Sequence, residues 1–551
     1  MLENPLEDIP KVLDVIKEFG ELAGFYINKG KTKMIVKNLD KQMTETLQEQ
    51  SGIKVVKKVK YLGVRLSARN SNIFEDNYVK VWKDVKMDLE RWGKMQLSLL
   101  GRISTIKMNV LPKMLFLFQT IPIISNMGCF KQWQREVARF IWQGKRPRIK
   151  YKILIDSRER GGFALPDLKL YYEAACLCWI KEWITLKNTR LLDLEGYGRR
   201  FGWHAYLWYD KVRVNRDFLN HCIRRSIFVT WSKYKELLER RVPQWISPME
   251  ALAQKKLNME NKWGTYRELL SFEKGGIKLK KLEDVKEWVP DWFSYHQLND
   301  LFRKDLIQGF SDCRSEFERK LLDGNEKIIS KMYGLLQEWE TKDEMVKAVM
   351  THWARDLGHN IEFAAWEKLW KKNLKFTACY TLRENYMKMM YRWYLTPDKL
   401  AKMYKNGDSS CWKCKTMEGN FFHMWWTCSK AKGYWEMTYN EILKIFKLTV
   451  PKKPEAFLLG IVGPEIPKEY FTVFMYATTA ARTIYAQKWK QEEVPTKEEW
   501  LMKMMDYAEM ARLTVKLREQ EEKKFFEDWK CFVEYLKKHH SYIISHVGFQ
   551  L

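Results

Sequence analysis

Three cysteines and one histidine are gathered in one short stretch of the chain, at Cys411, Cys414, His423 and Cys428. The grouping is unusual because the whole sequence has only 10 cysteines and 9 histidines. Three thiolates and one imidazole form a Cys₃His set, which can close a tetrahedron around Zn²⁺. The Cys-x₂-Cys spacing of the first pair lets two sulfurs reach one ion. The stretch therefore predicts a structural zinc site.

The spacing of the last two ligands sets a condition on the backbone. His423 and Cys428 are five residues apart, which puts them about 140° apart around a regular α-helix. Both can bind one ion only if the segment is a turn or a distorted helix. The alternative interpretation is a buried aromatic segment whose cysteines are small apolar residues. Its aromatic members would be Phe421, Phe422, Trp425 and Trp426.

The composition indicates a folded protein with a polyanionic partner. The 551 residues are 46% hydrophobic and 14% aromatic, which allows several buried cores and excludes a disordered tail. A formal net charge of +28 favours nucleic acid as the partner. No apolar run is long enough to cross a bilayer, and no secretory signal opens the chain, so we expect no membrane partner. Cysteines without such a signal favour a cytoplasmic or nuclear protein.

Apolar residues recur at helical spacing over much of the chain, which predicts a mainly α fold. Three apolar helix faces are expected over residues 78–92, 99–110 and 130–140, and Pro112 should end or kink the second helix. A shorter amphipathic helix is expected near the N-terminus, followed by a short strand pair. Lys60–Val64 alternates like a strand, and residues 496–538 read as one long charged helix with an apolar stripe.

Residues 144–152 combine basic, aromatic and proline residues in the way expected of a loop that follows a phosphate backbone. The basic members are Lys145, Arg146, Arg148, Lys150 and Lys152, and Pro147 and Tyr151 lie between them. Lysine and arginine neutralise phosphates, and an exposed tyrosine can stack on a base. The alternative interpretation is a basic loop that only keeps the protein soluble.

Several strings in the chain resemble, in the same order, the second-open-reading-frame protein of LINE-type (non-LTR) retrotransposons. The strings are Phe19–Lys33, Lys60–Val64, Trp92–Lys113, Phe140–Ile149, Gly161–Asp167, Met390–Pro397 and the His-x-Trp-Trp-x-Cys of His423–Cys428. In that family they follow the catalytic Y/F-x-D-D hairpin of the reverse transcriptase. The family's first cysteine gap has three residues rather than two, so Cys414 is the ligand that departs from its pattern.

The resemblance implies a short α/β palm remnant, a helical thumb, a helical connector, a segment with the Cys-His knuckle and a helical tail. The corresponding ranges are 1–68, 69–150, 151–345, 346–450 and 451–551. It also implies binding of RNA or an RNA/DNA hybrid, with stacking faces at Trp412, Trp425 or Trp426. Besides the five basic residues of the loop, the expected nucleic-acid contacts are Lys31, Lys60, Tyr61, Gly63, Arg102 and Lys107.

Polymerase activity is not expected, because two metal ions at such a centre need paired carboxylates and the chain contains no Asp-Asp dipeptide. We therefore expect a nucleic-acid-binding fragment without a polymerase or endonuclease centre. One alternative is a retrotransposon remnant that serves as a protein scaffold, with a partner on its C-terminal helix. Another is a truncated gene model of an active RNA-directed DNA polymerase.

Overall fold

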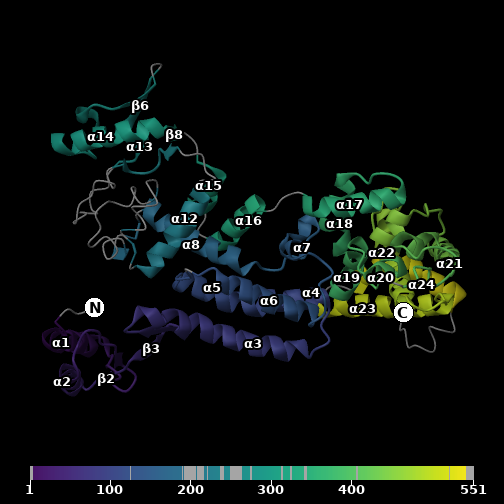
Figure 1. Cartoon of the computed structure of the whole chain (residues 1–551), viewed down its shortest axis with the longest axis horizontal. Coiled ribbons are helices and arrows are strands. Elements are labelled where there is room, and N and C mark those ends of the chain that lie inside the picture. The colour runs from purple at the N-terminus through teal and green to yellow at the C-terminus, as the bar shows by residue number, and fades with distance from the viewer. Residues whose placement is uncertain are drawn as a thin grey trace. The chain divides into compact units, whose positions relative to one another are not determined.

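A computed structural model describes residues 4–540 of the chain, apart from several gaps. The gaps are 125, 186, 189, 192–206, 208–215, 217, 220, 236–240, 249–263, 274–275, 312–313, 323–325, 341–343, 405–406 and 520–521. The described part is mainly helical, as predicted (Figure 1). None of its helices combines the length and apolar character that crossing a bilayer requires.

The chain forms two compact units, and each is assembled from three separate stretches of sequence. Unit 1 consists of Met1–Trp92, Met108–Val137 and Asp167–Glu340. Unit 2 consists of Gly93–Lys107, Ala138–Pro166 and Thr341–Leu551. Residues that are distant in sequence therefore meet within each unit.

Unit 1 begins with the predicted amphipathic helix, α1 (Pro5–Ala23). Strand β1 (Lys33–Met34) pairs in parallel with β2 (Lys54–Val55), and α2 (Lys41–Ser51) connects them. The apolar side of α1 is uncovered by the described residues, since Val15 and Phe19 are 64% and 63% exposed. The helix is therefore present as predicted, but its apolar face is not part of a core.

The predicted single strand over Lys60–Val64 is interrupted by a two-residue hairpin turn. Strands β3 (Lys58–Tyr61) and β4 (Val64–Ser67) pair antiparallel, with Tyr61 opposite Val64. Leu62 and Gly63 form the two-residue turn with φ of 45° and 87°, a conformation that favours glycine. A Cβ at Gly63 would lie 3.1 Å from the Phe116 ring. Gly63 thus serves both the turn and a close approach of the backbone to the Phe116 ring.

The main core of unit 1 buries the predicted apolar faces of Tyr78–Leu89 and Phe130–Val137, and Figure 1 labels the helices that carry them. Its helices are η2 (Glu75–Val79), α3 (Lys80–Gly93), α5 (Leu111–Thr120), the first part of α6 (Gly128–Trp142) and α8 (Leu168–Thr185). The Trp82 and Trp133 rings stack with centroids 5.0 Å apart. The buried Tyr78 hydroxyl donates to the carbonyls of Leu117 and Ile121, so the aromatic faces interlock as their spacing predicted.

Pro112 has the effect expected of it. Helix α4 (Leu99–Thr105) passes into a π-helical turn, η3 (Ile106–Val110), and α5 then begins with Pro112 in its first turn. Proline has no N–H to continue the α-helical ladder, and its ring crowds the preceding turn. One π-helical turn therefore interrupts the α-helical hydrogen bonding just before Pro112, where the sequence predicted an end or a kink.

The remaining elements of unit 1 come from residues 222–340. They are α12 (Cys222–Lys235), β5 (Val242–Pro243), α13 (Tyr266–Leu269), β6 (Leu270–Glu273), β7 (Gly276–Leu279), η6 (Leu282–Val285), α14 (Trp292–Gln308), β8 (Phe310–Ser311), α15 (Glu316–Leu322) and α16 (Ile328–Glu340). Strands β5 and β8 pair in parallel, and β6 and β7 pair antiparallel. Much of the predicted connector, including 192–206 and 249–263, lies outside the described residues.

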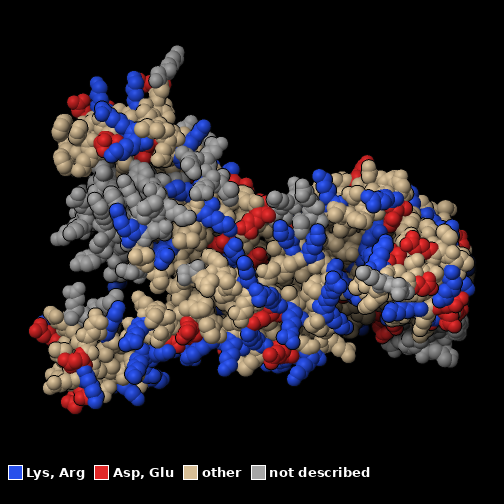
Figure 2. Space-filling model, in the orientation of Figure 1, with Lys and Arg blue, Asp and Glu red and all other residues tan. Residues whose placement is uncertain are grey.

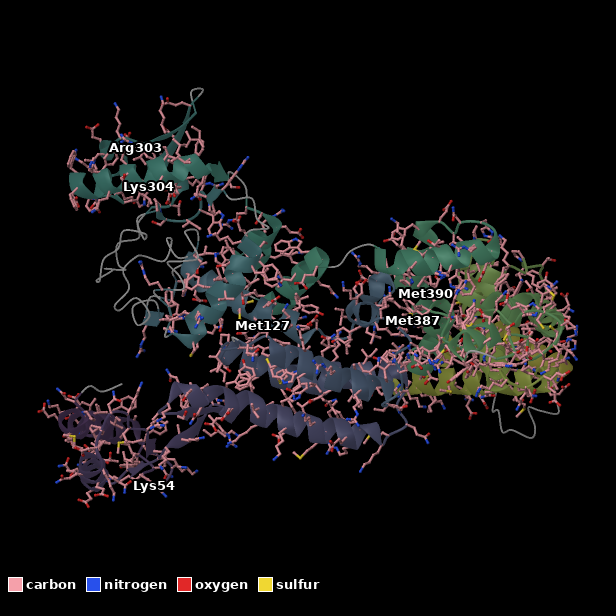
Figure 3. The ribbon with its side chains drawn as sticks, in the orientation of Figure 1. Lys54, Met127, Arg303, Lys304, Met387 and Met390 are labelled. Atoms are coloured by element: carbon pink, nitrogen blue, oxygen red, sulfur yellow. The ribbon has the colours of Figure 1, made fainter. Side chains whose placement is uncertain are left out.

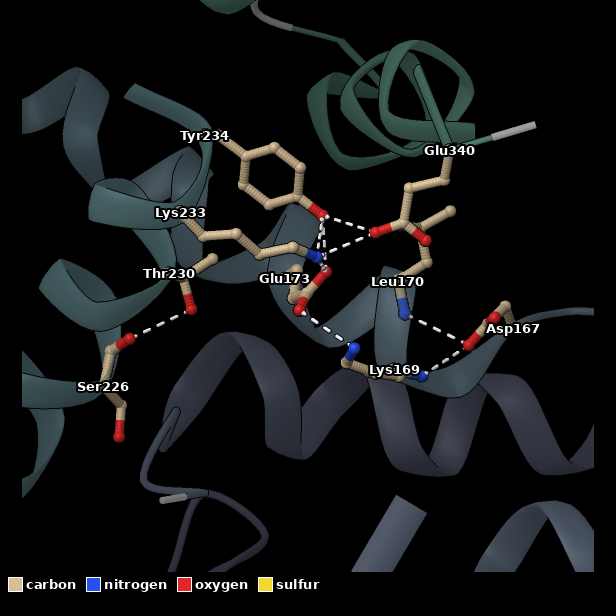
Figure 4. A network of polar contacts seen from close by, with 9 residues as sticks. All are labelled: Asp167, Lys169, Leu170, Glu173, Ser226, Thr230, Lys233, Tyr234 and Glu340. Atoms are coloured by element: carbon tan, nitrogen blue, oxygen red, sulfur yellow. Dashed lines mark hydrogen bonds and ion pairs between the residues drawn. The ribbon is translucent and has the colours of Figure 1, made fainter. Parts of the chain in front are cut away.

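A polar network joins three helices of unit 1 (Figure 4). The buried Glu173 carboxylate on α8 accepts from the Lys233 ammonium at 2.9 Å and from the Tyr234 hydroxyl, both on α12. Lys233 also pairs with Glu340 on α16 at 2.7 Å. Burial, together with the charge of Glu173, raises the pKa of Tyr234. The hydroxyl therefore stays protonated and serves as a donor, which fixes α12 and α16 against α8.

Unit 2 is built mainly from the C-terminal third of the chain. Its elements are α4, α7 (Tyr151–Ile155), η4 (Arg158–Arg160), α17 (Glu344–Leu357), α18 (Phe363–Lys371), η7 (Asn373–Lys375), α19 (Tyr380–Met390), α20 (Pro397–Met403), η8 (His423–Thr427), α21 (Ser429–Phe446), η9 (Glu455–Leu459), α22 (Lys468–Gln487), α23 (Lys497–Leu517) and α24 (Glu522–His539). Helix α22 contacts α19, α21, α23 and α24. Figure 3 labels Met387 and Met390 on α19.

The predicted long helix over 496–538 is wrong, because α23 and α24 are separate helices that pack against each other. Glu519, between them, has a positive φ of 54°, which a continuous right-handed helix does not allow. Met504 and Tyr507 of the predicted stripe are buried, whereas Leu513 and Leu517 are 54% and 77% exposed. Two shorter helices can both cover α22, which one straight helix cannot.

Candidate metal centre

The four predicted ligands meet in unit 2. One ligand atom from each of Cys411, Cys414, His423 and Cys428 can be chosen so that all lie within 4.8 Å of one another. The Sγ atoms of Cys411 and Cys428 are 3.9 Å apart, and Cys414 Sγ is 3.4 Å from His423 Nε2. Metal bonds of about 2.3 Å to sulfur and about 2.0 Å to nitrogen put tetrahedral ligand atoms roughly 3.5–3.8 Å apart. The cluster can therefore hold a metal ion.

The backbone between the last two ligands is distorted in the way their spacing requires. His423–Thr427 is a π-helical turn, and the Cys428 N–H donates to the His423 carbonyl at 2.9 Å. Cys428 itself has φ −58° and ψ 139°, so it leaves the helix before α21 begins. A wider turn followed by an extended residue brings the two side chains together. Such π-turns are often associated with functional sites.

The first two ligands lie on a tight backbone turn. The Cys411 N–H donates to the Met417 carbonyl at 2.8 Å, and the Lys415 N–H donates to the Cys411 carbonyl at 2.9 Å. Ser410 and Glu418 form an antiparallel bridge across this turn. The turn directs both sulfurs toward the same point, which is the geometry that the Cys-x₂-Cys spacing predicts.

A second layer of contacts orients His423. Its Nδ1 lies 3.3 Å from the Thr427 hydroxyl, while its Nε2 faces Cys414. The Asn420 side chain accepts from the His423 N–H at 2.8 Å. A partner on one ring nitrogen fixes which nitrogen is offered to a metal. Nε2 is therefore the ligand atom of His423.

The thiols of the cluster have different proton affinities. Burial raises the pKa of Cys411 to about 11, and the nearby Cys428 acts in the same direction. Partial burial also opposes ionisation of Cys414, but hydrogen bonds from Thr416 and His423 outweigh it and lower its pKa to about 5. A cation among these sulfurs would favour the thiolate form, since the thiolate is the metal-binding species.

Lys413 lies inside the protein between the first two ligands. Its side-chain ammonium donates to the carbonyls of Lys488, Gln491 and Glu493 at 3.1, 3.0 and 2.9 Å. The turn that follows α22 is thereby fixed against the metal centre. Three thiolates around a divalent cation carry a net charge of −1, which the Lys413 charge offsets. Sequence reasoning missed this residue because a lysine between two cysteines carries no signal of burial.

The aromatic residues of the knuckle are mostly used in packing. Trp425 is fully buried and stacks on Trp489 with centroids 5.2 Å apart, so its proposed role as a stacking face for a base is wrong. Trp426 packs on Trp435 and Phe457. Trp412 is half-buried, with its ring edge toward Trp489. The aromatic segment and the metal ligands thus coexist, although sequence analysis treated them as alternatives.

Gly419 is expected to tolerate no side chain, because a Cβ there would lie 2.6 Å from Pro397 and 3.0 Å from the Cys411 Cα. Gly419→Ala should lower the thermal midpoint by several degrees, since overpacking costs about 1–3 kcal/mol. Gly433→Ala on α21 is the matched control, because a Cβ there meets nothing within 4 Å and alanine favours a helix. Equal midpoints for the two variants in thermal unfolding would contradict this packing.

The predicted nucleic-acid contacts are distributed over both units. Lys31, Lys60, Tyr61 and Gly63 are exposed in unit 1. In unit 2, the exposed members are Lys107, Lys145, Arg146, Arg148, Lys150 and Lys152. Arg102 is half-buried, and its guanidinium donates to the carbonyls of Ile141 and Leu97. Burial lowers the pKa of Arg102, so this side chain serves the fold.

The basic loop is fixed to the segment that leads into the metal centre. Arg148 lies over the Trp393 ring at 5.1 Å and donates to the Trp393 carbonyl at 2.8 Å. Trp142 stacks on the same ring at 5.5 Å. Farther along, the Leu395 carbonyl accepts from the Trp489 indole at 2.7 Å. Sequence reasoning did not single out Trp393, since its partners are about 250 residues earlier in the chain.

No protein-family model matches the chain.

Proposed function

We propose that this chain binds RNA or an RNA/DNA hybrid with little sequence preference, as the C-terminal part of a LINE-type reverse transcriptase. The observation that carries the proposal is the exposed basic loop of 144–152, which Arg148 fixes beside Trp393. Lys145, Arg146, Lys150 and Lys152 are exposed and form no ion pair with a described residue. Unpaired cations on a fixed loop can neutralise phosphates in any sequence.

The overall charge supports the same proposal. The chain has 97 lysines and arginines against 69 acidic residues. Figure 2 shows basic side chains over all described parts of the visible face, with fewer acidic ones between them. A protein with this excess attracts polyanions from a distance and binds them in a salt-dependent way.

Zinc is the ion that we propose for the metal centre. Thiolate and imidazole ligands together favour zinc over the hard cations that prefer oxygen. All four positions of a tetrahedron are supplied by the protein, which leaves no open position for a water or substrate. When bound, the ion would hold together residues 411–428, and a structural role follows from this closed ligand set.

We propose no polymerase activity for this chain, because its sequence lacks the Asp-Asp pair that such a centre would need. A protein-interaction scaffold is the second candidate function. It is favoured by the exposed apolar residues at the end of α23, where Met510, Leu513 and Leu517 are 44%, 54% and 77% exposed. Exposed apolar side chains of this kind could be covered by a protein partner that binds the C-terminal helices. We propose the cytoplasm or the nucleus as the location.

Fluorescence anisotropy of a labelled RNA, measured across a salt series, tests the proposed function. We expect the logarithm of the binding constant to fall linearly with the logarithm of the salt concentration. If six to ten phosphates are contacted, the binding constant should fall about 10³–10⁵-fold between 50 and 200 mM salt. An unlabelled RNA/DNA hybrid should compete. A folded chain that binds no RNA at 50 mM salt would exclude the proposal and favour the scaffold.

A further inference from the structure

A cavity of about 260 Å³ in unit 2 lies apart from the metal centre. Its walls come from α4, the η4 turn, α18, η7 and α19. The apolar part is formed by Leu100, Trp370, Leu374 and Met387, and Figure 3 labels Met387 on α19. The cavity therefore joins segments that are more than 200 residues apart in sequence.

The wall of this cavity carries an excess of positive charge. Arg158, Lys371, Lys375 and Arg383 line it, against one carboxylate, that of Glu159. Lys371 pairs with Glu367 at 2.9 Å. The other three basic residues form no ion pair with a described residue. Their charges are available to an anion within the cavity.

Arg158 and Arg383 are close enough to repel each other electrostatically, and Arg158 also lies over an aromatic ring. Burial lowers the pKa of Arg383, and the neighbouring Arg158 and Arg518 lower it further. Arg158 lies over the Tyr380 ring at 5.8 Å. A hydrogen bond with Ser104, followed by the charge of Arg158, lowers the pKa of Tyr380. These shifts describe clustered cations that an anion would stabilise.

Close packing and hydrogen bonds fix the elements that form the wall of the cavity. A Cβ at Gly161 would lie 2.8 Å from the Trp370 indole, and the Gly161 carbonyl accepts from the Tyr391 hydroxyl at 2.7 Å. Arg383 Nε donates to the Thr377 carbonyl at 2.6 Å, which orients its guanidinium. The turn that carries Arg158 is thereby pinned to α18 and α19.

We infer that this cavity binds a nucleoside monophosphate unit, either as a free nucleotide or as the terminal residue of an RNA strand. The phosphate would lie between Arg158, Lys375 and Arg383, since a guanidinium fork suits phosphate oxygens. The base would lie against Tyr380 and the apolar wall, because every base has a face that stacks on aromatic rings. The volume of about 260 Å³ lies just below the range of about 300–1,000 Å³ for ligand pockets, so the inferred ligand is a single small unit.

Titration calorimetry with AMP, adenosine and inorganic phosphate tests the inference on the full chain. We expect AMP to bind at least tenfold more tightly than either fragment. Arg158→Glu and Lys375→Glu should each weaken AMP binding tenfold or more, because each replaces a cation beside the phosphate with an anion, and both side chains are exposed. Arg355→Glu on α17 makes the same charge change outside the cavity and should leave AMP binding unchanged.

A second experiment distinguishes a free nucleotide from the end of an RNA strand as the ligand. It also tests the cavity separately from the RNA binding proposed for the loop. If an RNA with a terminal phosphate displaces AMP and its hydroxyl-ended counterpart does not, the site takes strand ends; if neither displaces AMP, it takes free nucleotides. AMP binding should survive charge reversal of the loop at 144–152. Equal binding of AMP and adenosine, or AMP binding unaffected by Arg158→Glu, would overturn the inference.

Discussion

Cys411→Ser is expected to reduce the bound zinc from one ion per chain to none and to destabilise unit 2 strongly. Cys411 is fully buried, and its Sγ lies 3.9 Å from that of Cys428. Structural zinc contributes about 10–16 kcal/mol of apparent binding free energy in small zinc-binding peptides. Losing even part of this is comparable with the whole stability of a typical domain, about 5–15 kcal/mol. Elemental analysis and thermal unfolding would measure the two effects.

A cysteine outside the cluster provides the control. Cys531 on α24 is half-buried and is not among the cluster residues, so Cys531→Ser should retain the full zinc content. A chelator should lower the thermal midpoint of the wild-type chain and of Cys531→Ser alike. Full zinc occupancy in Cys411→Ser would show that Cys411 is not a ligand, and no zinc in the wild-type chain would exclude the proposed ion.

Reversing the charge of the basic loop is expected to weaken RNA binding by roughly 10²–10³-fold at about 0.1 M salt, because each neutralised single-strand phosphate contributes a salt exponent of about 0.7. The slope of the logarithm of the binding constant against the logarithm of the salt concentration should become shallower by about 3. The variant combines Lys145→Glu, Arg146→Glu, Lys150→Glu and Lys152→Glu. Arg148 is left in place because it holds the loop on Trp393. Anisotropy across a salt series measures both quantities.

The matched control makes the same change in net charge at four exposed lysines of unit 1, at Lys11, Lys17, Lys281 and Lys286. It should change affinity much less than the loop variant, since it removes only long-range attraction. If the two variants weaken binding equally, the loop makes no specific contribution and net charge alone accounts for the affinity. If neither variant weakens RNA binding, the residues that contact phosphate lie outside both sets of substituted residues.

Much of the local structure was predicted from the sequence, because the signals for it are short in range. The face from Tyr78 to Leu89 is buried as its spacing predicted, since a helix brings every third or fourth residue to one side. The π-helical turn before Pro112 lies where a missing N–H predicts a break in the α-helical pattern, and the metal ligands lie within one turn and the π-turn after it. The two wrong elements were the strand at 62–63 and the helix across Glu519, where a left-handed backbone breaks an otherwise regular pattern.

The sequence by itself determined the helical fold class, the apolar faces and the ligand set of the metal centre, because each depends on residues close together in the chain. Only the tertiary structure decided how distant side chains are used. It placed Trp425 in the core, buried Lys413 against the turn after α22, and put Arg148 on Trp393, which is 245 residues away. It also assembled the cavity around Arg158 and Arg383. Contacts across such separations depend on how helices pack, which local spacing does not encode.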